Sequence, residues 1–306
     1  MRALFGNRKA LLGLGILGVF ALVAVVGPWI VGDPTDFVDV PLLPPSLAHW
    51  LGTTAQGQDV LAQTVAGARS TLLLGVIVGL ATVAVGALVG TAAGYSGGWT
   101  DEALSLVINL FLLMPGLPLA VVIAAYLPAG PATIGLVLVI TGWAWSARVI
   151  RAQALSLRQS VFVSSALVIG ERPLRIVLFE ILPNMTSLLA SSFIGATIYA
   201  IGAEVGLEFL GMGDLNTVTW GTNLYWASND VALPSGSWWT FVPTGACIAL
   251  VGFALALLNN ALDELSNPRL GAERAFVRAT GRKRLELQAP TPVLRDVTGT
   301  ESHVRG

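Results

Sequence analysis

The sequence is poor in charge, in histidine and in cysteine. Charged residues make up 11% of the chain, whereas soluble domains carry about 25%. The two histidines, His49 and His303, are far apart in the sequence, so a histidine-based metal site is not expected. Cys247 is the only cysteine. It therefore cannot form a disulfide within the chain, and we expect it to be a small packing residue in the last apolar run.

Sequence motifs of common enzymes are also missing. The only lysines are Lys9 and Lys283, and neither lies in a phosphate-binding loop of the pattern G-x-x-x-x-G-K-[ST]. Neither a G-x-S-x-G elbow nor an H-E-x-x-H helix occurs. We therefore expect no catalytic residue, no resident cofactor and no metal in this chain.

Apolar sequence is abundant instead. Hydrophobic residues make up 54% of the chain, and the mean hydropathy is +0.74. Several runs are apolar enough, and most are long enough, to cross a hydrocarbon core about 30 Å thick. These runs are residues 11–32, 70–94, 104–127, 131–147, 186–206 and 241–262. The sequence predicts an all-α integral membrane protein with six transmembrane helices, because helices satisfy their own backbone hydrogen bonds in lipid.

The basic residues predict the orientation of these spans. With an even number of spans, both termini lie on the same side of the membrane. Every lysine and arginine except Arg69 then falls on that side. Basic residues accumulate in cytosolic segments. We therefore expect a protein of the bacterial cell membrane whose N and C termini and residues 148–185 lie in the cytosol. Arg69 is expected at the outer mouth of the second span.

The chain divides into three parts. Residues 1–69 contain the first span and an outer loop, in which residues 33–69 are rich in proline and aspartate and are expected to be irregular and extended. Residues 70–270 form the membrane core. Residues 271–306 form a basic cytosolic tail, which we expect to be mostly disordered or to lie on anionic lipid.

Few polar side chains fall inside the spans, and these are candidates for a solute pathway. Glu204 and Glu208 lie at the outer end of the fifth span, where they could face a pathway or cap the helix end in water. Asn109 in the third span could bond across helices or contact a ligand. Met114 and Pro115 mark the point where we expect this span to bend, because proline removes a backbone donor.

Glycines recur along one face of the second span. Placed at 100° per residue, they form a single stripe. The stripe consists of Gly75, Gly79, Gly86, Gly90 and Gly94. Small residues on one face let helix backbones approach closely. This pattern predicts helix packing and not a binding site.

Tryptophans are concentrated in a second outer loop, residues 207–240. They are Trp220, Trp226, Trp238 and Trp239. An aromatic belt at the level of the lipid headgroups would account for them. A docking surface for an external partner would account for them as well.

The polar segment 148–185 is the most informative part of the sequence. It contains no proline or glycine before Gly170, which allows a turn, and Pro173 can open a short second helix that Pro183 would stop. Apolar side chains lie among its polar residues. They include Val161, Phe162, Ile169 and Phe179. Such side chains would be exposed in a solvated loop, which indicates a docking site for a cytosolic partner.

This segment resembles the EAA loop of ABC importer permeases, the motif on which their ATPases dock. Ala166, Gly170, Leu182 and Pro183 match the spacing of the family. Serines occupy the two positions before Ala166, where the family usually has glutamate and alanine, and Glu171 or the arginines could replace the missing polar contact. The docking residues that the resemblance implies are Phe162, Ser164, Ser165, Ala166, Gly170, Glu171, Arg172, Leu182 and Pro183.

Further motifs resemble the C-type subunits of dipeptide and oligopeptide permeases. They are His49–Thr53, Gly57–Leu61, Gly67–Arg69, Gly94–Trp99, Glu208–Gly213, Trp220–Gly221 and Asn267–Arg269. The resemblance covers about residues 8–270 and implies a type I ABC importer permease fold, with the permease core at residues 70–270. It also implies a B-type permease partner, two cytosolic ATPases that bind ATP and Mg²⁺, and an external substrate-binding protein that the tryptophan loop could contact. Membrane lipid is the remaining partner, and no nucleic acid is expected.

The resemblance favours the permease subunit of an ATP-driven importer. The alternative is an ATP-independent secondary transporter or channel, which the lack of a convincing inverted repeat disfavours. A membrane enzyme would need a catalytic cluster that the sequence does not contain. The substrate stays open, because the subfamily imports peptides, nickel complexes, glutathione, haem and some oligosaccharides. The tryptophan-rich loop leaves an oligosaccharide or β-glucoside as an alternative to a peptide.

Overall fold

The computed structural model describes residues 7–230 and 234–266. The predicted tail 271–306 and the motif Asn267–Arg269 lie outside these residues. The chain up to Leu262 forms one unit. Within the described residues the structure is helical, apart from turns and loops and one isolated bridge between Thr53 and Asp59. The all-α prediction is therefore confirmed.

Among the described residues, five helical stretches are long and apolar enough to cross a membrane, and a bent pair of helices adds a sixth if it is counted as one span. The long elements are α2 (Arg8–Ile30), α3 (Val60–Ser96), α6 (Pro131–Arg158), α9 (Thr186–Phe209) and α11 (Val242–Ser266). The bent pair is α4 (Gly98–Leu113) and α5 (Gly116–Ala125), which meet at 85°. With this pair counted as one span, the number of spans agrees with the sequence prediction, and the bend lies at Met114 and Pro115 as predicted.

Two helices extend well beyond the predicted spans. Helix α3 starts at Val60, so the prediction of an irregular outer loop is right for residues 33–59 and wrong for the residues that follow. Asp59 caps α3, because its side chain accepts a hydrogen bond from the Ala62 N–H at 3.0 Å. At the other side of the membrane α6 continues to Arg158. Polar residues end a hydrophobic run, but they do not end a helix that lacks proline and glycine.

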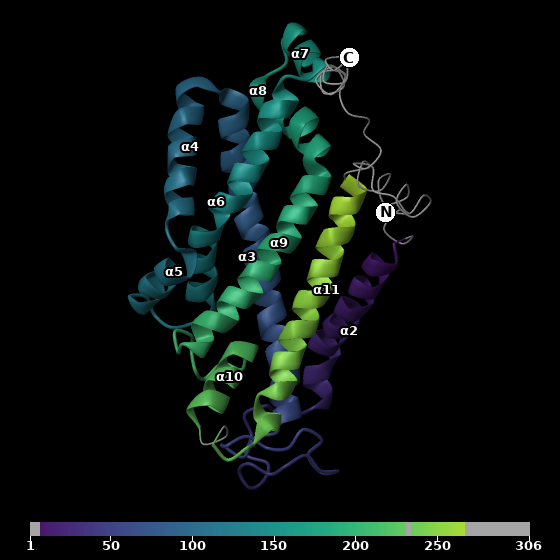
Figure 1. Ribbon diagram of the computed structural model, residues 1–306, viewed down its shortest axis with the longest axis vertical. Coiled ribbons are helices and arrows are strands. Elements are labelled where there is room, and N and C mark those ends of the chain that lie inside the picture. Colours follow the sequence, from purple (N-terminus) through teal and green to yellow (C-terminus); the bar gives the residue numbers. More distant parts are fainter. Residues whose placement is uncertain (1–6, 231–233, 267–306) are drawn as a thin grey trace, which may run out of the picture. The chain divides into compact units, whose positions relative to one another are not determined.

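Helix α3 is the central element, and it packs against α2, α6 and α9. Its glycine stripe lies at these contacts: a Cβ at Gly79 would lie 3.0 Å from the Thr197 backbone nitrogen of α9, and one at Gly86 would lie 2.7 Å from the Ser146 Cβ of α6. The stripe is therefore a packing surface, as predicted. Figure 1 shows α9, α11 and α2 side by side in front of α3.

The second outer loop contains regular structure. It holds helix α10 (Trp220–Asn229) and a short 3₁₀ turn, Trp238–Thr240. The segment between the membrane ends of α6 and α9 also folds, into α7 (Val161–Val168), α8 (Pro173–Arg175), a π-helical turn (Ile176–Ile181) and a 3₁₀ turn (Leu182–Met185). These two regions contain most of the residues that the sequence singles out.

Candidate functional site

The cytosolic hairpin, defined here as residues 159–185, has a different helical plan from the one predicted. The lack of proline and glycine before Gly170 favours one unbroken helix up to that turn, but α6 ends at Arg158 and the chain turns at Gln159 and Ser160 before α7. Ser160 stabilises this turn, because its hydroxyl donates to the Leu157 carbonyl at 2.5 Å. Side-chain competition for backbone groups of this kind is what makes serine favour helix ends.

Pro183 does not end a helix, which corrects the prediction made for it. The helical run is continuous from Pro173 to Phe209. Before Pro183 the run widens into a π turn, in which the Leu182 N–H bonds the Val177 carbonyl. In a regular α-helix the proline ring would clash with the carbonyl four residues earlier, and the wider turn relieves this clash. The hairpin is therefore joined directly to membrane helix α9.

Gly170 closes α7 in a Schellman motif. Its N–H bonds the Leu167 carbonyl, and the Glu171 N–H bonds the Ala166 carbonyl, both at 3.1 Å. Gly170 has φ +81°, and a Cβ added there would meet nothing within 4 Å. The position requires glycine for its backbone angle and not for lack of space.

One side of the hairpin is buried against the membrane helices. Val163 and Ala166 pack with Ile150 of α6 and with Ile176 and Ile181 of the following turn. Ala166, a residue that matches the family motif, therefore holds the hairpin together. It does not lie on the exposed surface.

The other side of the hairpin exposes a patch of large apolar side chains. This hairpin patch consists of Val161, Phe162, Val168, Ile169, Leu174 and Phe179. Val168 is the most exposed of them, at 86%. A groove of about 380 Å³ beside the patch is lined by Glu171, Arg175 and Glu180 together with apolar residues. Exposed large apolar side chains gathered on one short segment are suited to binding another protein.

Several polar residues of the hairpin bond within it. The Ser164 and Ser165 hydroxyls donate to the carbonyls one turn earlier, at 3.1 and 2.9 Å. Glu171 accepts an ion pair from Arg175 at 3.2 Å and lies at the groove. Arg172 and Pro183 are exposed, and Leu182 is half-buried. Glu171 is thus a carboxylate beside the patch, in a loop where the usual motif glutamate is replaced by serine.

An ion pair that the sequence analysis missed links α6 to α4. The Arg151 guanidinium donates to both carboxylate oxygens of Asp101, at 2.5 and 2.8 Å. Asp101 lies in the first turn of α4 and also accepts from the Ser105 hydroxyl at 3.1 Å. The sequence contained a signal for this pair, because Asp101 is an acidic residue at the start of a helix on the side of the membrane where the arginines gather.

At the outer end of α9, Glu208 is enclosed by the following loop. The helix ends in a second Schellman motif, with Gly211 at φ +79° and the Met212 N–H bonded to the Leu207 carbonyl at 3.0 Å. The Thr219 hydroxyl, at the start of α10, donates to the Glu208 carboxylate. Gly221 lies directly against the same side chain. Glu208 is 1% exposed, so the expectation that it caps the helix end in water is wrong.

Glu204 is just as deeply buried, one turn earlier on α9. On a helical wheel it shares a narrow stripe with Thr197 and Ile201, which face the glycines of α3. Neither of its carboxylate oxygens has a hydrogen-bond partner within the described part of the chain. It does not cap the helix in water either, and an unsatisfied buried carboxyl is costly in a folded protein.

The tryptophans have three different environments. Trp220 is fully buried: its ring nitrogen donates to the Thr64 carbonyl at 3.0 Å, and the ring meets Phe20 edge-on. It is a core residue, so it belongs neither to an exposed belt nor to an exposed docking surface in this structure. Trp239 is partly buried, and its ring nitrogen donates to the Thr53 carbonyl at 3.2 Å. Trp226 and Trp238 are exposed.

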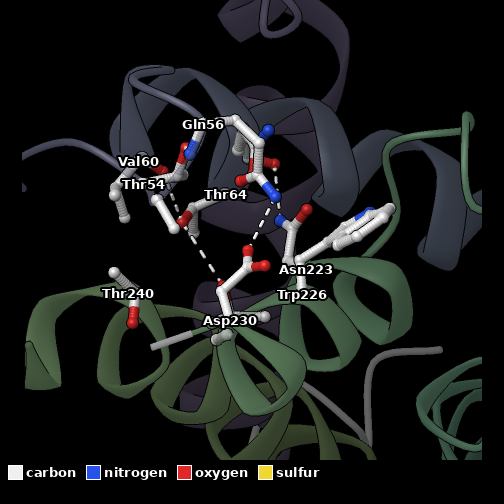
Figure 2. Close-up of a pocket in the computed structure, with 12 residues that line it drawn as sticks. Thr54, Gln56, Val60, Thr64, Asn223, Trp226, Asp230 and Thr240 are labelled. Carbon is white, nitrogen blue, oxygen red and sulfur yellow. Dashed lines mark hydrogen bonds between the residues drawn. The ribbon is translucent and has the colours of Figure 1, made fainter. Parts of the chain in front are cut away.

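Polar contacts fasten α10 to the outer loop 33–59 and to the first turn of α3. The Gln56 amide donates to Asp230 at 2.6 Å, and the Asn223 amide donates to the Gln63 carbonyl at 3.1 Å (Figure 2). The cavity between Thr54, Trp226 and these residues measures about 10 Å³, which is about enough for one water molecule. This junction is therefore a packed contact and not a ligand pocket.

His49 fastens the same loop to the start of α3. Its Nδ1 lies 3.0 Å from Asp59 and its Nε2 lies 3.5 Å from Asp39. The hydrogen bond with Asp59 is the main reason that the pKa of His49 is raised above its usual value of 6.5. Asp59 is also the residue that caps α3, so one carboxylate joins the loop, the histidine and the helix.

The remaining pathway candidates lie on the bent third span. Asn109, Met114 and Pro115 are all exposed. The Asn109 side chain makes no hydrogen bond to another described residue, so the bond across helices that the sequence suggested is not formed within this part of the chain. These residues lie on a surface that a second membrane chain or a solute can reach.

Comparisons with known proteins agree with this architecture. Residues 86–270 match the family described as binding-protein-dependent transport system inner membrane component. Residues 1–45 match the N-terminal transmembrane domain of oligopeptide transport permease C.

Individual relatives match along most of their length. The dipeptide transport system permease protein DppC of Bacillus subtilis is 32% identical over 277 residues, which cover 88% of this chain and 84% of the relative. The oligopeptide transport system permease protein OppC of Mycobacterium tuberculosis is 31% identical over 283 residues, which cover 91% and 96% of the two chains. OppC of Bacillus subtilis is 30% identical over 271 residues, which cover 86% and 87%.

Proposed function

Because this chain belongs to the inner membrane components of binding-protein-dependent transport systems, we propose that it carries peptides or related small solutes into the cytoplasm. It is a multi-pass permease subunit of the inner membrane and is not itself the ATPase. The relatives named for dipeptide and oligopeptide transport support a peptide substrate. Oligosaccharide, haem and metal-complex cargoes are the alternatives that a substrate screen must include.

The cytosolic hairpin is the proposed docking site for the ATPases. The observation that carries this proposal is the hairpin patch, which exposes large apolar side chains on the side of the membrane where ATP is available. Phe162, Glu171 and Arg172 would contact the ATPase directly. Ala166, Gly170, Leu182 and Pro183 would shape the hairpin, and Ser164 and Ser165 would lie at its exposed face.

Motion of the hairpin has a direct route into the membrane. It is continuous with α9 through the turns that contain Pro183, and it packs on α6 through the buried cluster around Ile150. ATP and Mg²⁺ would bind to the partner ATPases. Their closure would push the hairpin and shift α6 and α9 between two arrangements.

The other parts of the chain receive roles by the same reasoning. Residues 70–270 form the permease core, residues 1–69 add the first helix and the outer loop, and residues 271–306 form the tail. A B-type permease would complete the pathway, against the exposed surface of the bent third span. The external substrate-binding protein would contact the outer face near Trp226 and Trp238, which are exposed.

A charge placed on the hairpin patch tests the docking role. Val168→Glu adds one negative charge at the most exposed residue of the patch, and Gln159→Glu adds the same charge at an exposed position two residues before Val161. We expect Val168→Glu to lower copurification of the ATPases at least tenfold, because a charge at the core of a protein interface is strongly unfavourable. Gln159→Glu should copurify with the ATPases as the unsubstituted chain does. Equal copurification by both variants would contradict the docking role.

Transport in vesicles tests the wider proposal. Vesicles that contain the chain, its membrane partner, the ATPases and the binding protein should accumulate a labelled dipeptide or oligopeptide only with ATP and Mg²⁺. Accumulation without any nucleotide, driven by an ion gradient, would favour a secondary transporter instead. A binding screen on the cognate receptor, with peptides and oligosaccharides side by side, identifies the cargo.

A further inference from the structure

An apolar groove of about 740 Å³ runs along the chain between α2, α3, α9 and α11. Its floor is made of buried side chains, among them Ile201 of α9 and Val251 of α11. Its rim is exposed and includes Leu73 and Val76 of α3. The hydroxyl of Thr197, on the floor, already donates to the Phe193 carbonyl at 2.9 Å. The groove therefore offers hydrophobic surface and no free polar group along its length.

Helix α2 contacts its neighbours closely at both ends of the groove, and Phe20 in its middle meets Trp220 edge-on. Near the cytosolic end Gly13 lies against the Ala254 carbonyl of α11, where an added Cβ would be only 2.8 Å away. Near the outer end Gly27 lies against Val65 of α3. The groove runs between these two close contacts and is lined by residues of both α2 and α9, and Figure 1 shows α2 next to α11.

One cation lies at the outer end of this groove. Arg69 of α3 lines the groove and is exposed. It forms no ion pair with another residue of the described chain. Residues 70–100, which follow it along α3 and into α4, contain no charged side chain, so Arg69 lies at the outer boundary of the hydrocarbon region. Trp29 of α2 lines the same groove and is exposed near the outer end of its helix, as expected for a residue at the level of the headgroups.

The two features together match one kind of ligand, an amphiphile with a long apolar chain and an anionic head. We propose that the groove binds a glycerophospholipid of the outer leaflet. One acyl chain lies along the groove, and the phosphate accepts hydrogen bonds from the Arg69 guanidinium. Moving an acyl chain from the bilayer into the groove gains no hydrophobic free energy, because both surroundings are apolar. Selectivity for a phospholipid comes from close packing of the acyl chain against the groove and from the charge-assisted hydrogen bond between Arg69 and the phosphate.

The observations favour lipid over a helix of a partner permease. A helix in this groove would have to place an acidic side chain next to Arg69, at the edge of the membrane. Every phospholipid carries a phosphate at this depth already. A bound lipid would also fill the space between α2 and α9, both of which line the groove.

The amount of phospholipid that the purified protein retains tests this proposal directly. The chain, purified with its transport partners in mild detergent, is analysed by native mass spectrometry and by extraction of bound lipid. We expect about one retained phospholipid per chain in the unsubstituted protein. Arg69→Gln should lower this retention about fivefold, since a cation near the headgroups contributes about 1 kcal/mol. Arg69→Lys should retain most of the lipid, because it preserves the charge.

A matched pair of tryptophan substitutions tests the groove itself. Leu73 and Leu80 lie on the same face of α3 and are equally exposed, at 60% and 62%, but only Leu73 lines the groove. Leu73→Trp should fill the groove and displace the lipid, whereas Leu80→Trp should leave lipid retention unchanged. Comparison of the two separates a specific site from a general effect of bulk on the membrane surface.

Three outcomes would overturn the proposal. One is equal lipid retention by the unsubstituted protein, Arg69→Gln and Leu73→Trp. Another is retention of a fatty acid or free phosphate in place of a phospholipid. The third is efficient cross-linking of a cysteine at position 73, in a Cys247→Ala background, to the partner permease. Transport is not the readout, so failure here is distinguishable from failure of the proposed docking role or substrate.

Discussion

Glu204 and Glu208 lie four residues apart on the same helix, but their surroundings differ. Both are 1% exposed. Glu208 accepts a hydrogen bond from Thr219 and joins α9 to the start of α10. Glu204 has no such partner among the residues that the structure describes. The spacing suggests a pair of similar groups, whereas the contacts show one structural carboxyl and one that the fold alone does not explain.

Leucine at each position should separate these two cases. Glu208→Leu leaves the Thr219 hydroxyl without its partner and should lower the free energy of unfolding by about 1–3 kcal/mol. Glu204→Leu removes an unsatisfied polar group and should leave stability unchanged or raise it. Thermal unfolding of the purified variants checks both results. Equal destabilisation by the two substitutions would show that Glu204 has a partner after all. Lost transport with intact stability would assign Glu204 a functional role.

His49 predicts a dependence of outer-loop stability on pH. Its pKa is higher in the folded chain than the usual 6.5 because of the nearby Asp59 and Asp39. The interaction therefore stabilises the fold fully below about pH 6.5 and is lost as the pH rises through the raised pKa. We expect the loop 33–59 to become more sensitive to proteolysis as the pH increases. His49→Gln should remove this dependence, and an unchanged pH profile in that variant would contradict the assignment.

At the scale of elements, the cytosolic ends of the helices are connected to one another. The hairpin continues into α9, packs on α6, and through Arg151 of α6 reaches Asp101 at the start of α4. Helix α4 leads to the 85° bend at Met114 and Pro115. A displacement of the hairpin can therefore reach the bent span through the bidentate ion pair between Arg151 and Asp101. A bidentate pair fixes the relative orientation of the two side chains better than a single hydrogen bond does.

Neutralising Asp101 tests this connection. Asp101→Asn should lower the free energy of unfolding by about 1–2 kcal/mol, because the pair is bidentate but only partly buried. Glu102→Gln removes the same charge from the neighbouring exposed position and should have almost no effect. The double variant with Arg151→Gln should be no less stable than Asp101→Asn alone. Additive losses would show that the two residues do not act as a pair.

At the scale of the molecule, the described chain has an outer part and a cytosolic part joined by the spans. The outer loop, α10 and the end of α9 are fastened together by hydrogen bonds such as that of Gln56 with Asp230. The cytosolic hairpin instead exposes apolar surface. This contrast fits a subunit whose outer part is held by its own contacts and whose inner part depends on a partner.

Labelling of single cysteines tests the orientation of the whole chain. Two single-cysteine variants are made in a Cys247→Ala background, Leu47→Cys in the outer loop and Val168→Cys on the hairpin patch. The side chains of Leu47 and Val168 are both largely exposed. A maleimide that cannot cross the membrane should label position 47 in spheroplasts and position 168 only in inverted vesicles. The opposite pattern would invert the topology and remove the hairpin from reach of the ATPases.

The sequence by itself determined the positions of the spans and the face of α3 that packs through glycines, and it predicted the orientation of the spans. The positions of the spans follow from local hydropathy, the packing face from glycine spacing along one helix, and the predicted orientation from the side on which arginines fall. None of these needs a contact between distant segments. It also located the bend at Pro115, because a missing backbone donor acts on its own helix.

Only the tertiary structure decided the roles that depend on neighbours distant in the chain. Trp220 is a core residue because Thr64 and Phe20 enclose it, and Glu208 is buried because Thr219 and Gly221 close over it. The groove that ends at Arg69 exists only where four helices meet. The burial of a side chain and its hydrogen-bond partners depend on how the chain packs. Hydropathy reports only the composition of a segment and does not show which other segments cover it.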